Sequence, residues 1–150
     1  MMVWQQAAIA LFALYSVSAL YLGYRQCRHK RNAYGLTPQY YPLGAFVWGD
    51  AVIFGIFWFL VSLTILYLAD WLLFWLIVSV FWAVRCLGEM MYWFMQQFSS
   101  INRNPPEHLH FYGLVNNDAV WLIYQIVMQC LCVVSIVSAI YVSAQWIRTF

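Results

Sequence analysis

Charged and amide side chains inside long apolar segments are the residues of this sequence whose types and spacing could support chemistry. Arg85 and Glu89 lie four residues apart, which places them on one face of a helix. Asp50 lies near the start of a second apolar segment, and a third carries Gln125 and Gln129, again four residues apart. Counted along helices at about 1.5 Å per residue, the three segments place these side chains at similar depth.

We predict that these five residues form one buried polar cluster, in which the planar guanidinium of Arg85 contacts the carboxylates of Asp50 and Glu89. One positive and two negative groups sum to −1, so one carboxyl group could hold a proton. Three interpretations stay open. The cluster is an ion-pair network that fixes helix register, or a site for an ion, a proton or a polar headgroup, or only an Arg85–Glu89 pair on one helix. Charges at the centre of a bilayer cost roughly 2.5–3.5 kcal/mol each on insertion scales, so partners are expected.

Four long apolar segments must position these polar residues. Of the 150 residues, 65% are hydrophobic and 8% are charged, whereas a soluble domain has roughly 25% charged residues. A soluble fold of this size could not bury so much apolar surface. Each segment has the roughly 20 residues that a membrane-spanning helix needs. The predicted spans cover residues 3–24, 45–69, 71–98 and 118–147.

The predicted fold class is an all-α integral membrane protein with a single domain, residues 1–150. We expect a four-transmembrane-helix bundle with short interfacial segments in the cytoplasmic loops. A β-barrel is not expected, because its strands would alternate apolar and polar residues over about ten positions. Only Asp70 separates the second and third spans, which predicts a tight turn and an antiparallel pair. Residues 32–44, rich in Tyr, Pro and Gly, are expected to lie along the membrane surface.

The distribution of lysine and arginine predicts the orientation of the spans. Arg25, Arg28, Lys30 and Arg31 follow the first span and Arg103 follows the third, whereas the turn after the second span has no basic residue. The two basic loops lie on the same side. The positive-inside rule makes that side cytoplasmic, or the matrix side in an organelle, and puts both termini outside. The membrane is then a plasma, inner or organelle membrane, and the clustered basic residues either set the topology or also bind anionic lipid headgroups.

Small residues recur every three or four positions along the first and fourth spans, a spacing that lets helices approach closely in lipid. In the first span they are Ala7, Ala10, Ala13, Ser16, Ala19 and Gly23, and the corresponding face of the fourth span has Gln125, Gln129, Cys132, Ser135, Ala139 and Ser143. These faces are expected either to meet within one bundle or to contact another protein. The many tryptophans of the second and third spans also favour a protein partner.

No motif assigns a catalytic, cofactor-binding or metal-binding residue. The sequence lacks the GxSxG, HExxH, P-loop and GxGxxG patterns. Cys130 and Cys132 are two residues apart on a predicted helix and therefore point to different sides, which argues against a disulfide between them. The net charge of +2 gives no basis for nucleic-acid binding.

These features favour a non-enzymatic membrane component that acts by assembly, as a homo-oligomer or as a subunit of a larger membrane complex. Its expected partners are membrane lipids and either further copies or other membrane-protein subunits. The first alternative is an oligomeric channel or transporter for an ion, a proton or a small solute, with a path that uses Asp50, Arg85 and Glu89. The second is a membrane enzyme acting on a lipid-soluble substrate, with Glu89 or Asp50 as general acid or base.

Overall fold

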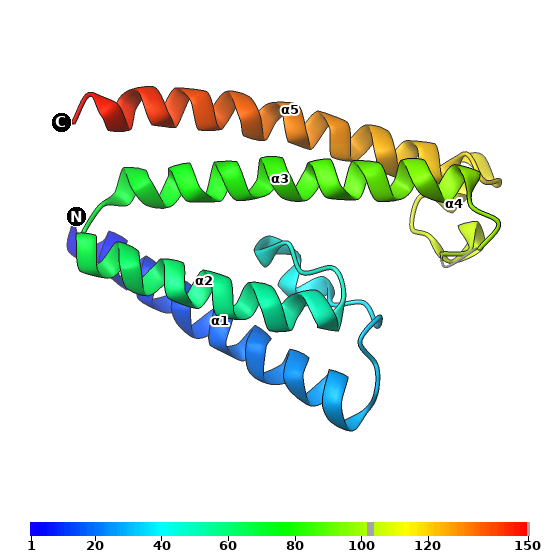
Figure 1. Ribbon diagram of the computed structural model, residues 1–150, viewed down its shortest axis with the longest axis horizontal. Helices are drawn as coiled ribbons and strands as arrows, with labels where there is room; N and C mark the ends of the chain where they lie inside the picture. The colour runs from blue at the N-terminus through cyan, green and yellow to red at the C-terminus, as the bar shows by residue number, and fades with distance from the viewer. Residues whose placement is uncertain (102–103, 150) are drawn as a thin grey trace. The chain divides into compact units, whose positions relative to one another are not determined.

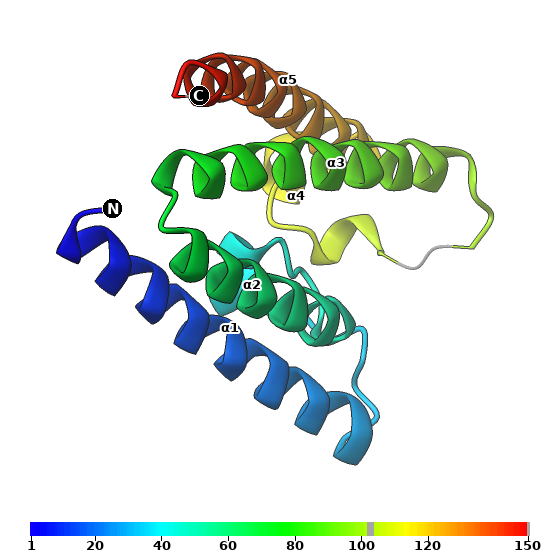
Figure 2. The same ribbon diagram turned by 60° about the vertical axis from the view of Figure 1, so that its left-hand side comes forward.

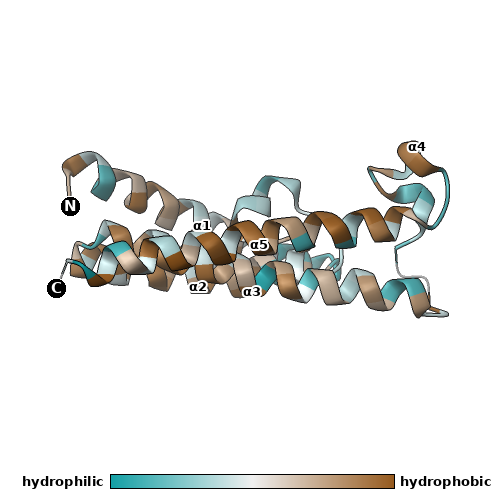
Figure 3. Ribbon diagram, turned by 90° about the horizontal axis from the view of Figure 1, so that it is seen from above, coloured by the Kyte–Doolittle hydropathy of each residue, from teal (hydrophilic) through white to brown (hydrophobic). Residues whose placement is uncertain are grey.

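The computed structural model describes residues 1–101 and 104–149, and within that part the chain is helical and has no β-strand (Figure 1). Four helices are long and apolar enough to cross a membrane: α1 (Val3–His29), α2 (Trp48–Leu68), α3 (Trp71–Phe98) and α5 (Val120–Ile147). Hydrophobic residues recur along all four of them (Figure 3). The loops contain η1 (Pro38–Leu43), η2 (Pro106–His108) and α4 (Tyr112–Val115). Arg103, which helps to predict the orientation, lies outside the described residues.

The four predicted spans correspond to the four long helices, but the end of the first and the start of the second differ from the predicted bounds. α1 continues to His29 rather than ending at residue 24. Its last turn contains Arg28 and His29, and positive charge there is favoured by the partial negative charge at a helix C-terminus. α2 begins at Trp48 rather than at residue 45, because residues 45–47 belong to the preceding loop.

The chain forms two compact units, Met1–Trp75 and Leu76–Phe150. In the first unit, α1 and α2 pack side by side (Figures 1 and 2). A Cβ atom added to Gly55 would lie 2.7 Å from the backbone nitrogen of Leu20, and one added to Gly23 would lie 3.0 Å from the backbone nitrogen of Val52. The two backbones therefore approach so closely that only glycine fits at Gly55.

The small-residue face predicted for the first span is confirmed over its C-terminal part. Its buried members are Ala13, Ser16, Ala19 and Gly23, which face a helix whose buried residues include Ala51, Gly55 and Ser62. The prediction is wrong for Ala7 and Ala10, which are exposed. Gln5 and Ile9 are buried there instead, so the contact face near the N-terminus is rotated from the one that the small residues suggest.

The predicted tight turn between the second and third spans is confirmed. α2 ends at Leu68, Ala69 adopts a left-handed conformation with φ of 53°, and α3 starts at Trp71. The backbone N–H of Leu73 donates a hydrogen bond of 3.0 Å to Oδ1 of Asp70. Asp70 therefore caps the start of α3, where the first N–H groups have no partner within the helix.

Residues 36–47, here called the fold-back segment, include most of the loop that the sequence predicts to lie along the membrane surface, and that placement stays a prediction. Leu36 and Val47 pair in an antiparallel bridge, and the chain between them turns back along the helices of the first unit (Figure 1). Thr37 holds the two ends together, because its N–H donates to the Phe46 carbonyl at 3.1 Å and its Oγ1 donates to the Ala45 carbonyl at 2.7 Å. Gly44 ends η1 with φ of 74°, a left-handed conformation that favours glycine.

In the second unit, α3 and α5 run antiparallel and contact each other along part of their length. The rings of Trp93 and Tyr124 stack with centroids 4.6 Å apart, and further along the pair Cys132 Sγ donates to the Ala83 carbonyl at 3.5 Å. α5 is the least covered of the four long helices: its buried residues are Val120, Trp121 and Cys132. The small-residue face predicted on this helix is buried only at Cys132.

Candidate functional site

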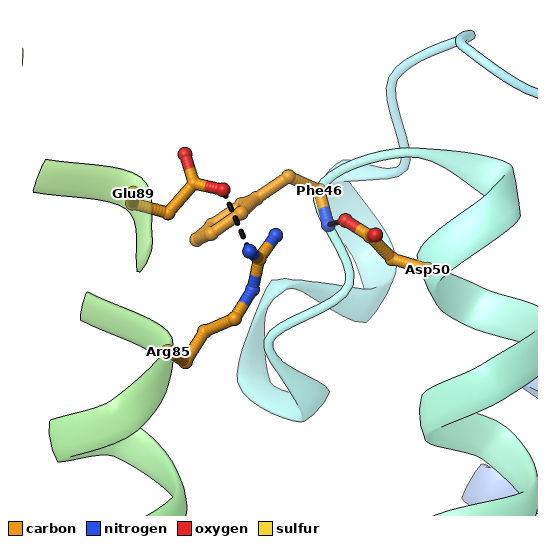
Figure 4. Close-up of polar contacts among 4 residues, drawn as sticks. All are labelled: Phe46, Asp50, Arg85 and Glu89. Carbon is orange, nitrogen blue, oxygen red and sulfur yellow. Dashed lines mark hydrogen bonds and ion pairs between the residues drawn. The ribbon is translucent and has the colours of Figure 1, made fainter. Parts of the chain in front are cut away.

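The ion pair on α3 is the first part of the predicted polar cluster. Nη1 of Arg85 lies 2.7 Å from Oε1 of Glu89, one helical turn away (Figure 4). The side chains of Arg85 and Glu89 are only 17% and 15% exposed. Arg85 is 14 residues from the start of α3, or about 21 Å along the helix axis. A largely buried, charge-assisted pair near the middle of an apolar helix can fix helix register or hold a proton or an anion.

Asp50 has a local structural role at the start of α2. It lies in the first turn of the helix, where negative charge is favoured by the helix dipole. Its Oδ2 accepts a hydrogen bond of 3.2 Å from the backbone N–H of Phe46, at the end of the fold-back segment (Figure 4). Asp50 belongs to the first compact unit and Arg85 and Glu89 to the second. A cluster that unites all three stays a prediction.

Gln125 has a partner that the sequence analysis missed. Its Oε1 accepts a hydrogen bond of 2.6 Å from Nε2 of Gln97, which also donates to the Trp93 carbonyl at 3.2 Å. Gln97 follows Glu89 by eight residues, or about 12 Å along α3. Gln125 therefore takes part in a polar contact separate from the Arg85–Glu89 pair. Gln97 could have been noticed in the sequence as an amide near the end of an apolar span.

Gln129 differs from the other four members of the predicted cluster because it is exposed. It lies nine residues from the start of α5, or about 14 Å along the axis, and it makes no hydrogen bond within the described part of the chain. An amide at this depth in a spanning helix is expected to find a polar partner.

A second polar layer lies where α3 and α5 meet the connecting loop. The indole N–H of Trp121 donates to the Asn104 carbonyl at 3.0 Å, and Nδ2 of Asn104 donates to the hydroxyl group of Tyr92. Gln96, 4% exposed, donates to the Ile101 carbonyl at 3.2 Å. The indole N–H of Trp93 is buried and has no partner among the described residues. These contacts hold the loop against the ends of the two helices.

The predicted basic cluster lies at the end of α1 and the start of the following loop. All four side chains are exposed: Arg25, Arg28, Lys30 and Arg31. Arg28 donates a hydrogen bond to the Tyr24 hydroxyl and lies over its ring, 5.6 Å from the centroid. The exposure suits both interpretations of the cluster, as a topology determinant and as a lipid-headgroup site, and both stay predictions.

The positions of the cysteines and of the potential metal ligands do not indicate a disulfide or a metal site among the described residues. All four cysteines are free, and Cys130 is exposed while Cys132 is buried, which confirms that they point to different sides of their helix. Within residues 1–101 and 104–149, no group of three or more His, Cys, Asp or Glu residues is arranged to hold a metal ion.

Comparison with protein-family models, with curated proteins and with solved structures gives no match for this chain.

Proposed function

We propose that this chain is an integral membrane protein that acts by assembling with further copies of itself through α5. The proposal includes insertion of α1, α2, α3 and α5 as four spans of one bundle. At about 1.5 Å per residue, the 21 residues of α2 extend about 31 Å, which matches a hydrocarbon core of about 30 Å. The other three long helices have 27 or 28 residues and are long enough to reach the headgroup region.

The observation that carries the proposal is a stripe of residues on α5, here called the α5 seam. Its members are Ile126, Gln129, Val133, Ile136 and Ile140, all of them exposed. They recur at alternating intervals of three and four residues, the spacing at which helices pack in a left-handed coiled coil. Every member except Gln129 is β-branched, so its side chain loses little rotamer freedom when a second helix packs against it.

Gln129 favours a second copy of the chain as the occupant of the seam. A glutamine amide both donates and accepts hydrogen bonds, so two copies related by a twofold axis can satisfy each other. A single polar residue within an apolar seam also fixes register and oligomeric state in coiled coils. Lipid chains offer such an amide no hydrogen-bonding partner.

Native mass spectrometry of the protein extracted gently from its own membrane tests this function. We expect a homo-oligomer with a defined number of copies. A monomer in both mild detergent and lipid nanodiscs would contradict the proposal. A complex with other proteins but with one copy of this chain would assign the α5 seam to a different partner.

The second candidate function is a channel or transporter for an ion, a proton or a small solute. The observation that favours it is the Arg85–Glu89 pair, because ionisable residues inside membrane spans often mark transport paths. Flux measured in proteoliposomes should then fall when Glu89→Gln removes the negative charge. Unchanged flux in the variant, or no flux in the unmodified protein, would leave the pair as a structural contact.

A further inference from the structure

The fold-back segment is anchored by side chains that come from both helices of the first unit. The Tyr15 hydroxyl group of α1 donates a hydrogen bond to the Gln39 carbonyl, and Ser18 Oγ lies 3.1 Å from the hydroxyl oxygen of Tyr40. From α2, the indole N–H of Trp58 donates to the Leu43 carbonyl at 3.0 Å. The rings of Tyr15 and Tyr40 also pack with centroids 5.4 Å apart. The segment is therefore part of the packed unit.

These anchors lie well inside the two helices. Trp58 follows Trp48, the first residue of α2, by ten residues, or about 15 Å along the axis. Its hydrogen-bonding partner, the Leu43 carbonyl, therefore lies beside the middle of α2 rather than beside its first turn. Ser18 precedes His29, the last residue of α1, by eleven residues, or about 16 Å. Measured along either of these antiparallel helices, η1 therefore lies more than one helical turn from the helix end that adjoins the connecting loop.

The backbone of the segment has few polar groups without partners. Pro38 and Pro42 have no N–H group to satisfy. The N–H groups of Tyr40, Gly44 and Ala45 donate to carbonyls within the segment. Four carbonyls of the segment also accept hydrogen bonds. The Gln39 carbonyl accepts from Tyr15 and the Leu43 carbonyl from Trp58. The carbonyls of Ala45 and Phe46 accept from Thr37. A loop in water would not need side-chain donors for its carbonyl groups, whereas a loop in hydrocarbon would.

The composition of the segment points the same way. Residues 36–47 contain no charged side chain, although four basic residues precede them within a dozen positions. Thr37, Tyr40, Leu43 and Ala45 are almost completely buried, whereas the exposed residues are Leu36, Pro38, Gln39, Tyr41 and Pro42. These exposed residues are a leucine, two prolines, a phenol and one neutral amide, so their insertion costs far less than that of charged residues.

We propose that the fold-back segment is a re-entrant element, which enters the hydrocarbon region from the side of the basic loop and returns to the same side. Non-helical backbone is tolerated at such depth only when it is covered by protein, and the contacts with α1 and α2 provide that cover. The inference rests on the proposed insertion of the four spans. It is independent of assembly through the α5 seam.

Cysteine labelling of the full-length protein in lipid nanodiscs tests this inference, with each site resolved by peptide mass spectrometry. Three variants are compared with a membrane-impermeant, charged maleimide: Gln39→Cys in the re-entrant element, Tyr34→Cys in the preceding loop, and Leu63→Cys on an exposed face of α2. Tyr34 is 85% exposed and outside the element, so its variant should label fast, whereas Leu63→Cys should stay unlabelled in lipid. We expect Gln39→Cys to label about tenfold or more slowly than Tyr34→Cys, because an apolar environment disfavours the reactive thiolate.

Labelling of Gln39→Cys as fast as Tyr34→Cys, with Leu63→Cys still protected, would overturn the re-entrant element while leaving the four spans intact. Fast labelling of all three would overturn membrane insertion and this inference together. Hydrogen exchange of the unsubstituted protein provides a second measurement that needs no variant. Amides of residues 40–45 should exchange at least about tenfold more slowly than those of residues 32–36, and equal rates would contradict the inference.

Discussion

The indole N–H of Trp58 donates a hydrogen bond of 3.0 Å to the carbonyl of Leu43, and both residues are almost completely buried. This contact joins the middle of α2 to the fold-back segment, fifteen residues earlier in the chain. It gives a buried carbonyl outside any α-helix a hydrogen-bonding partner.

We expect Trp58→Phe to destabilise the protein by about 1–3 kcal/mol, because the Leu43 carbonyl loses its donor while staying buried. Thermal or denaturant unfolding in detergent micelles measures the change. Trp4→Phe is the control, since Trp4 is exposed near the N-terminus and its substitution should change the unfolding free energy little. Equal effects of the two substitutions would show that the hydrogen bond contributes nothing beyond the ring.

Two glycine substitutions should have effects of opposite sign. Gly55→Ala adds a Cβ atom 2.7 Å from the Leu20 backbone, so α1 and α2 must separate at a cost of about 1–3 kcal/mol. At Gly88 on α3, the added atom meets nothing within 4 Å, and alanine should stabilise the helix by about 0.5–1 kcal/mol. Unfolding free energies of the two variants provide the test, and a stabilising Gly55→Ala would disprove the close helix contact.

Glu89→Gln should destabilise the protein by about 1–3 kcal/mol, because the Arg85 guanidinium loses its charged acceptor in a largely buried place. Glu107→Gln, an identical change at an exposed loop residue, is the matched control and should be nearly neutral. Unfolding measured for both variants in the same detergent isolates the effect of burial. Loss of stability at Glu107 comparable to that at Glu89 would argue against a structural ion pair.

Two glutamines on facing helices of the second unit should separate assembly from folding. Gln129→Leu should weaken dimerisation about threefold to thirtyfold, the range expected for an interhelical hydrogen bond in a membrane. Gln97→Leu should instead lower folding stability, since Gln97 donates to Gln125 within one chain. Dissociation measured by dilution in lipid vesicles, together with unfolding, distinguishes the two. A Gln129→Leu variant that dimerises normally would exclude that amide from the interface.

The long helices are the part of the fold that the sequence predicts well. Apolar runs of more than twenty residues have few alternatives in a chain this poor in charge, and Asp70 marks the turn between two of them. Ala13, Ser16 and Ala19 predict a close-contact face on α1, because small residues at regular spacing allow close approach, but the sequence analysis does not identify α2 as the helix that covers it. The predicted face fails at Ala7, which lies six residues before Ala13 and therefore about 120° around the helix from it, while Gln5 and Ile9 continue the contact.

The fold-back segment and the partner of Gln125 could not be predicted in the same way. Tyr15 and Trp58 look like ordinary aromatic residues of apolar spans, and nothing in their spacing shows that they donate to loop carbonyls. Pairing between Gln97 and Gln125 depends on the register of α3 against α5, which is set by side-chain packing rather than by periodicity. The sequence pattern therefore predicts which segments are helical, but it does not predict which single side chains contact each other in the folded chain.

Disulfide crosslinking at two adjacent valines of α5 tests assembly through the seam most directly. Val133 belongs to the seam and Val134 does not, yet they are 61% and 62% exposed, so they differ only in the face they occupy. Each is replaced by cysteine in a Cys130→Ala background, oxidised in lipid vesicles, and mapped by peptide mass spectrometry. We predict that Val133→Cys forms an intermolecular disulfide and that Val134→Cys does not, because only the seam brings two copies within disulfide distance. Equal crosslinking at both positions, or crosslinking at Val134→Cys alone, would contradict assembly through the α5 seam.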